Sequence, residues 1–312
     1  MLDRHAGVQL KKDIWRCAIV SAPADLIVAA GSLDGLPLTW IPDAGPLRYL
    51  ADPFGLWRAG RLYVFAELFD YRDAIGRICV STYDDTLTLI DQAVVLAEPW
   101  HLSYPFVLES EGETWMIPEA FQSGGLLLYR AAAFPHRWVR SARIMLDHVP
   151  LDATPFHDGD RWWLFYAPAF PVTARLTQLC AAYADRLDGP WQPYAGNPFF
   201  VDSAGARPGG TVVWHNGAAH LPIQGCESSY GDKLRLLRFE RLHPDAIVAA
   251  PVGVLEAPGA AAPFTDGCHT LSAAGPVTLI DVKRTRIAPR SLMMRPLRGL
   301  YRRRRATAAH EW

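Results

Sequence analysis

The feature that most constrains the fold is a short pattern that recurs five times along the 312-residue chain. Each copy has a glycine, two or three variable residues and then a run of apolar and aromatic side chains, typical of a β-strand entered from a tight turn. The glycines lie 52, 47, 58 and 58 residues apart, which indicates one structural unit repeated along the chain. The copies are GRLYVFAE (60–67), GETWMIPE (112–119), GDRWWLFY (159–166), GAAHLPIQ (217–224) and GPVTLIDV (275–282).

Other short strand-like runs complete each unit. A run precedes each glycine, as in ADPFGL, SYPFVL and ATPFHD, with ARPGGTVV and CHTLS in the last two units, and further runs such as RICVSTY follow. About four strands per unit predict an all-β protein, a five-bladed β-propeller. The segment at 14–23 has no glycine-led strand of its own, so we expect it to close the ring by joining the last blade. This predicts an N-terminal arm at 1–12, the propeller at 13–285 and a basic tail at 286–312.

The end of the chain is basic and the rest is acidic. Residues 283–312 carry ten basic side chains and one acidic one, which leaves 21 basic and 31 acidic groups in the remainder. An acidic body argues against a nucleic-acid-binding protein. The basic end alternates apolar and basic groups, which fits contact with an anionic membrane surface. The alternative is a solvated tail that folds back on the acidic body.

Several signals bear on location and cofactors. No apolar run approaches the roughly 20 residues of a membrane helix, and the first fifteen residues lack the apolar core of a signal peptide. The five cysteines are scattered without a CxxC pair, which argues against a disulfide framework or zinc cluster. We therefore expect a cytoplasmic protein, peripheral at the inner membrane face if the tail binds lipid. We expect no cofactor and no metal, because nucleotide fingerprints, a GxSxG elbow and metal-ligand spacings are missing.

Polar residues occur in the predicted strands where packing would call for apolar ones. The first strand of each propeller blade borders the central channel, so residues far apart in sequence should converge on one axial funnel. A further acid lies in the predicted loop GCESSYGD at 225–232. The candidates are Asp52, His101, Tyr104, Asp152, Arg207 and His269 in first strands, Glu67, Glu119 and Gln224 at the ends of glycine-led strands, and Glu227 in the loop.

Carboxyl groups gathered in one polar funnel fit chemistry at a glycosidic bond. One carboxyl must donate a proton to the leaving oxygen, while another, ionised, activates water or attacks carbon. Arg207 would hold an acidic group or orient a carboxylate by a bidentate contact. Structural alternatives exist: Asp52 and Asp152 can belong to turns, and Glu67 can pair with an arginine.

A set of segments spread along the chain resembles a known domain. Over about residues 13–285 they are similar to the propeller domain at the N-terminus of plant glucosamine inositolphosphorylceramide transferases and to bacterial relatives of that domain. This family is in turn similar to the five-bladed propellers of glycoside hydrolase family 43. The segments are ADPFGLW, PWHLSYPFV, WMIPEAF, LLLYRAAAFPHRW, LDATPFHDGDRWWLF, LDGPWQPYAGNPF, ARPGGTVV and DGCHTLS.

The resemblance implies a carbohydrate-active pocket and roles for its acids. Inverting family 43 enzymes use an Asp base, an orienting Asp and a Glu acid, which implies the base role for Asp52 and the orienting role for Asp152. The acid departs from the pattern, because Glu119 precedes the second Asp whereas the family's acid follows it. Glu227 has the expected order. Related domains have Gln-Asp-Cys where this chain has Gln-Gly-Cys at 224–226, so one funnel acid is absent there.

Two alternative functions are consistent with these residues. In the first, the protein cleaves or transfers a glycosyl group in surface-glycan or glycolipid metabolism, with Asp52 as base or nucleophile, Glu119 as acid and Asp152 as modulator. The other candidates would then bind substrate. In the second, the protein is a non-catalytic glycan-binding or scaffold module that assists a separate glycosyltransferase. The partner in both cases is a saccharide or glycolipid.

Overall fold

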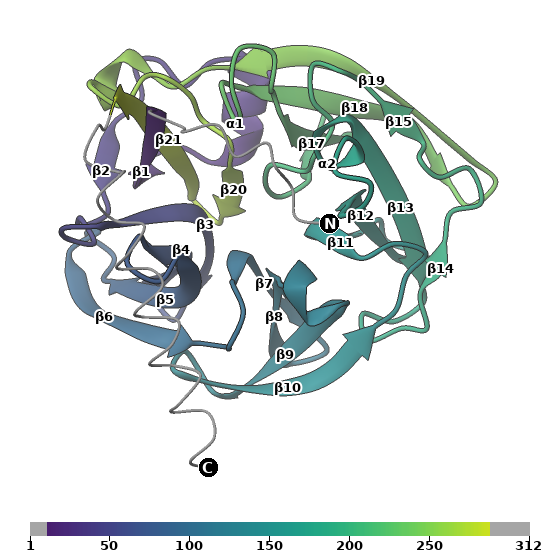
Figure 1. Cartoon of the computed structure of the whole chain (residues 1–312), viewed down its shortest axis with the longest axis horizontal. Coiled ribbons are helices and arrows are strands. Elements are labelled where there is room, and N and C mark those ends of the chain that lie inside the picture. Colours follow the sequence, from purple (N-terminus) through teal and green to yellow (C-terminus); the bar gives the residue numbers. More distant parts are fainter. Residues whose placement is uncertain (1–10, 288–312) are drawn as a thin grey trace, which may run out of the picture.

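The computed structural model describes residues 11–287, and these form a five-bladed β-propeller (Figure 1). The blades surround a central axis, and each blade is an antiparallel sheet with one strand next to that axis. The predicted fold class is therefore confirmed.

Each of the first four blades comes from one continuous stretch of chain, with strands in sequence order from axis to rim. In the third blade an additional strand, β15, pairs with β13. The first blade contains β3 (Arg48–Arg58), β4 (Arg61–Asp70), β5 (Ile75–Tyr83) and β6 (Leu89–Leu96). The second contains β7 (Ser103–Ser110), β8 (Glu113–Glu119), β9 (Leu126–Ala133) and β10 (Arg137–Ile144). The third contains β11 (Pro150–His157), β12 (Trp162–Pro168), β13 (Gln178–Ala184), β14 (Gln192–Pro193) and β15 (Phe200–Val201). The fourth contains β16 (Val213–His215), β17 (Ala218–Gln224), β18 (Leu234–His243) and β19 (Ala246–Leu255).

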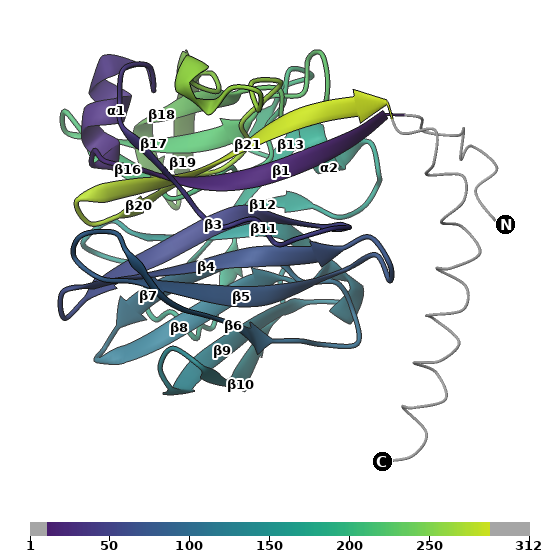
Figure 2. The same ribbon diagram turned by 90° about the vertical axis from the view of Figure 1, so that its left-hand side faces the viewer.

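The last blade joins the two ends of the described chain. Its strand order is β2 (Leu38–Trp40), β1 (Lys11–Val20), β21 (Val277–Ile287) and β20 (Leu271–Ala274). Strands β1 and β21 pair along the whole length of β1 and run side by side in Figure 2. This confirms that the N-terminal strand closes the ring, and it removes the open sheet edge that an unclosed propeller would expose.

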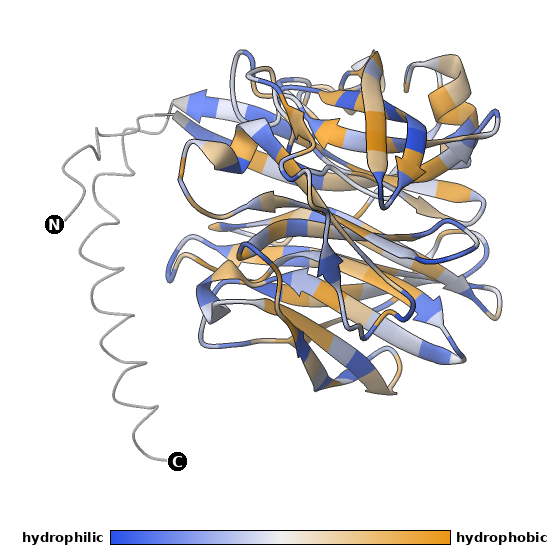
Figure 3. Cartoon of the chain, turned by 90° about the vertical axis from the view of Figure 1, so that its right-hand side faces the viewer, coloured by the Kyte–Doolittle hydropathy of each residue, from blue (hydrophilic) through white to orange (hydrophobic). Residues whose placement is uncertain are grey.

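The glycine-led strands are the second strands of all five blades. Their apolar side chains pack between neighbouring blades, and Figure 3 shows hydrophobic stretches along the strands. At the junction of the first two blades, for example, the ring of Phe65 in β4 lies 5.6 Å from that of Trp138 and 6.1 Å from that of Phe134, measured between centroids. Burial of such apolar surface, at roughly 25 cal/mol per Å², is the main force that holds one blade against the next.

Helical segments are short. The structure has α1 (Ala24–Ala30), α2 (Ala174–Thr177) and the 3₁₀ turns η1 (Phe121–Ser123) and η2 (Gly259–Ala261). Within the described part of the chain, no helix has the length and apolar character needed to cross a membrane. The predicted arm at 1–12 and basic tail at 286–312 fall almost entirely outside the described residues.

Candidate functional site

The innermost strands of the first three blades are interrupted at equivalent positions. Pairing of β3 with β4 shifts between Ala51 and Phe54, and β7 and β11 show the same irregularity. The first residue after each break has a left-handed backbone, with φ of 51° at Asp52, 45° at Tyr104 and 48° at Asp152. Such a conformation costs on the order of 1–3 kcal/mol and persists only where the surroundings enforce it. The three bulges therefore mark a place where side-chain direction takes precedence over regular pairing.

The bulges border a cavity of about 210 Å³ that all five blades line. Pockets that enclose drug-sized ligands have roughly 300–1,000 Å³, so this cavity suits a single ring. Eight residues outside the sequence-based predictions contribute to its wall: Trp15, Tyr49, Ala51, Ser103, Phe121, Leu151, Arg175 and Tyr230. Six of the predicted site residues line it: Asp52, Glu67, His101, Glu119, Arg207 and His269.

Asp52 is fixed by neighbouring blades. Its Oδ2 accepts a hydrogen bond from the backbone N–H of Tyr104 at 3.1 Å, and its Oδ1 accepts one from the Thr270 hydroxyl at 3.1 Å. Its own backbone N–H donates to Asp281 Oδ2 at 3.0 Å. Burial raises the pKa of Asp52 to about 6, although the nearby positive charge of His269 acts in the opposite direction. The carboxyl group thus bridges the first, second and last blades.

His269 and Asp281 form a buried pair beside Asp52. The imidazole Nδ1 lies 2.7 Å from Asp281 Oδ2, and its Nε2 lies 3.5 Å from Asp52 Oδ1. The ring stacks on Trp15 with centroids 3.8 Å apart. Burial lowers the pKa of His269, but the charge of Asp281 and its hydrogen bond outweigh burial, so the pKa lies above its usual value. The pair therefore places an imidazole that favours its charged form next to the Asp52 carboxyl.

The same three residues offer possible metal ligands. The ligand atoms of Asp52, His269 and Asp281 lie within 4.8 Å of one another. However, Asp281 Oδ1 already accepts the backbone N–H groups of His269 and Thr270 at 3.0 and 2.9 Å, and the imidazole Nδ1 faces the other oxygen. This arrangement fits a hydrogen-bonded ion pair better than a cation site.

Asp152, in the third blade, holds Arg207 of the fourth blade. The guanidinium Nε and Nη2 donate to the two Asp152 oxygens at 2.5 and 2.8 Å, a bidentate contact. The Gln224 side-chain amide donates to Asp152 Oδ2 and to the Pro208 carbonyl, both at 2.7 Å. Burial lowers the pKa of Arg207, but the charge of Asp152 outweighs burial and raises it well above the usual value. The arginine is therefore a fixed positive charge in the cavity wall.

Glu119 is a buried carboxyl with both oxygens engaged. Its Oε1 accepts the backbone N–H of Phe121 at 2.6 Å, and its Oε2 accepts the Ser103 hydroxyl at 3.1 Å. Burial, assisted by the negative charge of Asp152, raises the pKa of Glu119 to about 7. At neutral pH this carboxyl is close to half protonated.

Glu67 is equally buried but receives no hydrogen bond from any described residue. Its Oε1 has His101 Nε2 at 3.5 Å. His101 Nδ1 accepts the backbone N–H of Gly76 at 2.9 Å, so the imidazole proton is on Nε2 and faces Glu67. Burial lowers the pKa of His101 to about 4, and burial together with nearby carboxyls raises the pKa of Glu67 well above its usual value. His101 is therefore uncharged at neutral pH, and Glu67 keeps its proton to a higher pH than an ordinary glutamate.

Four predicted site residues do not line the cavity: Tyr104, Asp152, Gln224 and Glu227. The Tyr104 side chain is fully buried, and its hydroxyl accepts the backbone N–H of Gly210 at 2.7 Å and bonds the Thr154 hydroxyl at 2.8 Å. Its contribution to the site is the backbone N–H that holds Asp52. Glu227 is exposed and ion-paired with Lys233. The side chains of Tyr104 and Glu227 are therefore not placed to contact a substrate in this cavity.

Gln224 also lies behind the cavity wall, where it holds Asp152. The next residue, Gly225, is closely packed. A Cβ there would come within 2.7 Å of Lys233 Cγ and 2.9 Å of Asp232 Oδ1.

The sequence-based prediction missed several site residues for identifiable reasons. Asp281 lies six residues after its glycine, whereas Glu67, Glu119 and Gln224 lie seven after theirs. Arg175 belongs to α2, outside the repeat. Its Nε donates to the Ala169 carbonyl at 2.7 Å.

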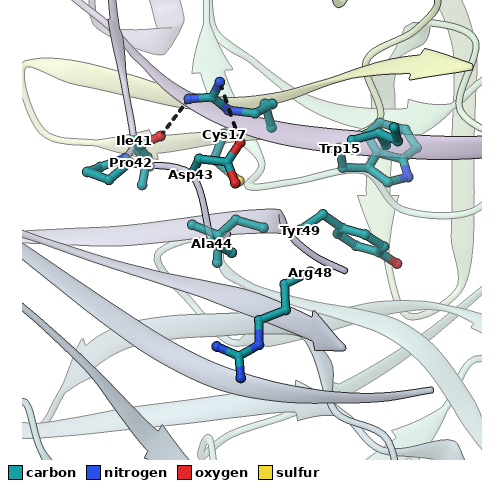
Figure 4. A pocket seen from close by; sticks show the side chains of 11 residues that line it. Trp15, Cys17, Ile41, Pro42, Asp43, Ala44, Arg48 and Tyr49 are labelled. Atoms are coloured by element: carbon teal, nitrogen blue, oxygen red, sulfur yellow. Dashed lines mark hydrogen bonds and ion pairs between the residues drawn. The ribbon is translucent and has the colours of Figure 1, made fainter. Parts of the chain in front are cut away.

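A smaller pocket lies next to the cavity, where β1 passes β3 (Figure 4). Its volume of about 20 Å³ suits about one water molecule. Trp15 and Tyr49 line both spaces and separate them. Arg16 also lines this pocket, with a hydrogen bond to the Ile41 carbonyl at 3.2 Å and an ion pair to Asp43 at 4.0 Å. This space is too small for a sugar, so the axial cavity is the candidate site.

Fold and site together define a five-bladed propeller with an acidic cavity at its axis. The family model for the N-terminal region of glucosamine inositolphosphorylceramide transferase 1 matches residues 40–257, and the chain belongs to this family. Proteins of that name from Oryza sativa subsp. indica and Arabidopsis thaliana are each 33% identical over 214 and 201 residues. The alignments cover 67% and 63% of this chain but only 28% and 26% of those relatives. The resemblance seen in the sequence is thus confirmed.

Solved structures share the fold at much lower identity. A family 117 glycoside hydrolase from Zobellia galactanivorans has a TM-score of 0.56 at 13% identity, covering 86% of this chain and 91% of that chain. A family 43 enzyme from Xanthomonas citri, solved with xylotriose, has a TM-score of 0.55 at 14% identity, covering 78% and 89%. At these identities the likeness concerns the fold alone.

Proposed function

We propose that the axial cavity cleaves or transfers a glycosyl group of a saccharide or glycolipid. The observation that carries this proposal is the pairing of unlike carboxyls around one cavity. Asp52 is held by hydrogen bonds from two other blades, while burial raises the pKa of Glu119 to about 7 and the pKa of Glu67 well above its usual value. Neighbouring acids with separated pKa values are the usual basis of acid–base catalysis at a glycosidic bond. The names of the plant relatives and structural neighbours, all concerned with carbohydrates, support this class of substrate.

The residues have distinct roles in this reaction. Asp52, in its ionised form, takes a proton from the attacking water or acceptor hydroxyl, or attacks the anomeric carbon itself. One protonated glutamate gives its proton to the leaving oxygen. Asp152 acts as the modulator by holding Arg207, which contacts the substrate. Since Asp52 must be ionised, turnover should rise with pH through about 6.

Replacement of Asp52 by asparagine tests the proposal. The amide can keep both contacts, because its oxygen can accept the Tyr104 N–H and its NH₂ can donate to the Thr270 hydroxyl. We expect Asp52→Asn to lower turnover of the substrate by at least about a hundredfold while sugar affinity changes little. Turnover on a panel of glycosides and calorimetric binding of the same sugars measure the two effects. Undiminished turnover in the variant would exclude Asp52 as base or nucleophile.

The second candidate function is a glycan-binding or scaffold module beside a separate glycosyltransferase. The specific observation in its favour is that the chain spans only 28% of the rice relative's length. In that case wild type and Asp52→Asn would both bind sugar and neither would turn it over. Binding without turnover is therefore the result that distinguishes this function from the first.

A further inference from the structure

Glu67 differs from every other carboxyl at the axis. Asp52, Glu119, Asp152 and Asp281 each accept two or more hydrogen bonds from backbone or side-chain donors. Glu67 lines the same cavity, is 5% exposed and accepts none from the described residues. A buried polar oxygen without a partner is costly, unless a ligand supplies the missing hydrogen bond.

The groups that face Glu67 come from four blades and from the loop before β7. They are the carboxyls of Asp52, Glu119, Asp152 and Asp281, together with His101. His101 is uncharged, so no positive charge in contact with Glu67 offsets the negative ones. A second negative charge here would be repelled, and the neutral acid is favoured. Glu67 thus favours its protonated form, and its Oε1 has no hydrogen-bond partner among the described residues.

From this arrangement we propose that Glu67 is the proton donor to the leaving glycosidic oxygen. This inference rests on the proposed function. The Glu67 O–H proton moves to the glycosidic oxygen while the bond between that oxygen and the anomeric carbon breaks, and the bonding electrons stay on the oxygen. Water or an acceptor hydroxyl bonds to the anomeric carbon and gives its proton to Asp52. The step leaves Glu67 ionised and Asp52 protonated, and exchange of one proton with solvent restores the site.

His101 is the positioning residue for this acid. The Gly76 N–H fixes the imidazole tautomer, so Nε2–H points toward Glu67 Oε1 at 3.5 Å. When the proton leaves, this N–H can stabilise the new carboxylate. Glu119 lacks this freedom because its oxygens are already taken by Phe121 N–H and the Ser103 hydroxyl. The structure therefore favours Glu67 over Glu119 as the acid.

The test compares Glu67→Gln with Glu119→Gln in the full chain on methyl and 4-nitrophenyl glycosides of the same sugars. A nitrophenolate leaves without protonation, so loss of the acid should matter only for the methyl glycosides. We expect Glu67→Gln to lower kcat/KM for methyl glycosides by roughly 10²–10⁴-fold and for nitrophenyl glycosides by less than about tenfold. It should also remove the fall in rate at alkaline pH. Glu67→Asp should retain that fall at a lower rate, and the exposed Glu109→Gln should behave like wild type.

The possible outcomes distinguish failure of the role proposed for Glu67 from failure of the proposed function. If Glu119→Gln alone shows the dependence on the leaving group, Glu67 is not the donor and the proposed function stands. If wild type turns over no glycoside, the proposed function fails and this inference fails with it. Infrared difference spectra of wild type and Glu67→Gln give a separate readout, because a protonated carboxyl at neutral pH should disappear in the variant. An ionised Glu67 at pH 7 overturns the inference whatever the activity.

Discussion

At the scale of single residues, backbone strain and hydrogen bonds between blades form the site together. Asp52 and Asp152 occupy left-handed bulges that only a crowded environment maintains. Hydrogen bonds from the second and last blades fix Asp52, and Arg207 and Gln224 of the fourth blade fix Asp152. Two of the three strained positions therefore carry a proposed role, and the third, Tyr104, supplies the backbone N–H that holds Asp52.

The raised pKa of Glu119 predicts a pH effect on stability. Its pKa rises from the ordinary glutamate value of 4.5 to about 7 in the folded protein. Between these values the folded protein retains a proton that the unfolded chain has released, so this stabilisation is present below about pH 4.5 and is lost as pH rises to about 7. Relative to Glu119→Gln, wild type should lose on the order of 3 kcal/mol of unfolding free energy across this window. Urea unfolding at several pH values measures the difference, and parallel profiles for the two proteins would contradict it.

At the scale of elements, the ring depends on close approach between the innermost strands of neighbouring blades. Gly210, just before β16, forms a parallel bridge with Leu271 at the start of β20. Its φ of 137° and its hydrogen bond to the Tyr104 hydroxyl join the second, fourth and last blades at one point. A Cβ at Gly210 would lie 1.8 Å from the Leu271 carbonyl oxygen.

Replacement of Gly210 by alanine should therefore push Gly210 and Leu271 apart and weaken the contact between the fourth and last blades. Gly217→Ala is a matched control, because Gly217 also has a positive φ, 72°, but nothing lies within 4 Å of its added Cβ. The control should lose roughly 1–2 kcal/mol from backbone strain alone. Gly210→Ala should lose a further 1–3 kcal/mol or more from overpacking. Chemical denaturation compares the two, and equal losses would show that the junction is not tightly packed.

At the scale of the whole molecule, charge is divided between an acidic body and a basic end. Residues 288–312 carry seven arginines and one acid. Basic residues near an anionic surface gain about 1 kcal/mol each, so we propose that this end holds the protein at the cytoplasmic face of the inner membrane.

Truncation tests this placement. The full chain should sediment with vesicles that contain phosphatidylserine at low salt, and salt should weaken this binding because it screens surface charge. A chain that ends at residue 287, which keeps all of β21, should lose most of the binding. Vesicles of phosphatidylcholine alone serve as the control. Equal sedimentation of the two proteins would place the membrane contact, if any, on the propeller.

The architecture could be predicted because it depends on short sequence patterns within single strands. The glycine-led strands and the leftover strand at the N-terminus each follow from patterns within ten residues, and five repeats leave few ring closures to choose from. Asp52, Glu67 and Glu119 could also be placed near the axis, since each occupies a repeat position. Asp281 and Arg175 could not, because the first departs from the repeat by one residue and the second lies in an insertion.

The sequence by itself determined the repeat, the number of blades and which polar residues approach the axis, because these depend on periodicity within single strands. Only the tertiary structure decided which of those residues share a cavity and what each one contacts. The Tyr104 ring turns into the core while its backbone N–H serves Asp52, and Glu67 alone among the axial carboxyls of the described chain is left without a donor. The physical reason is that hydrogen bonds between blades join residues up to 229 positions apart, a distance over which strand patterns hold no information.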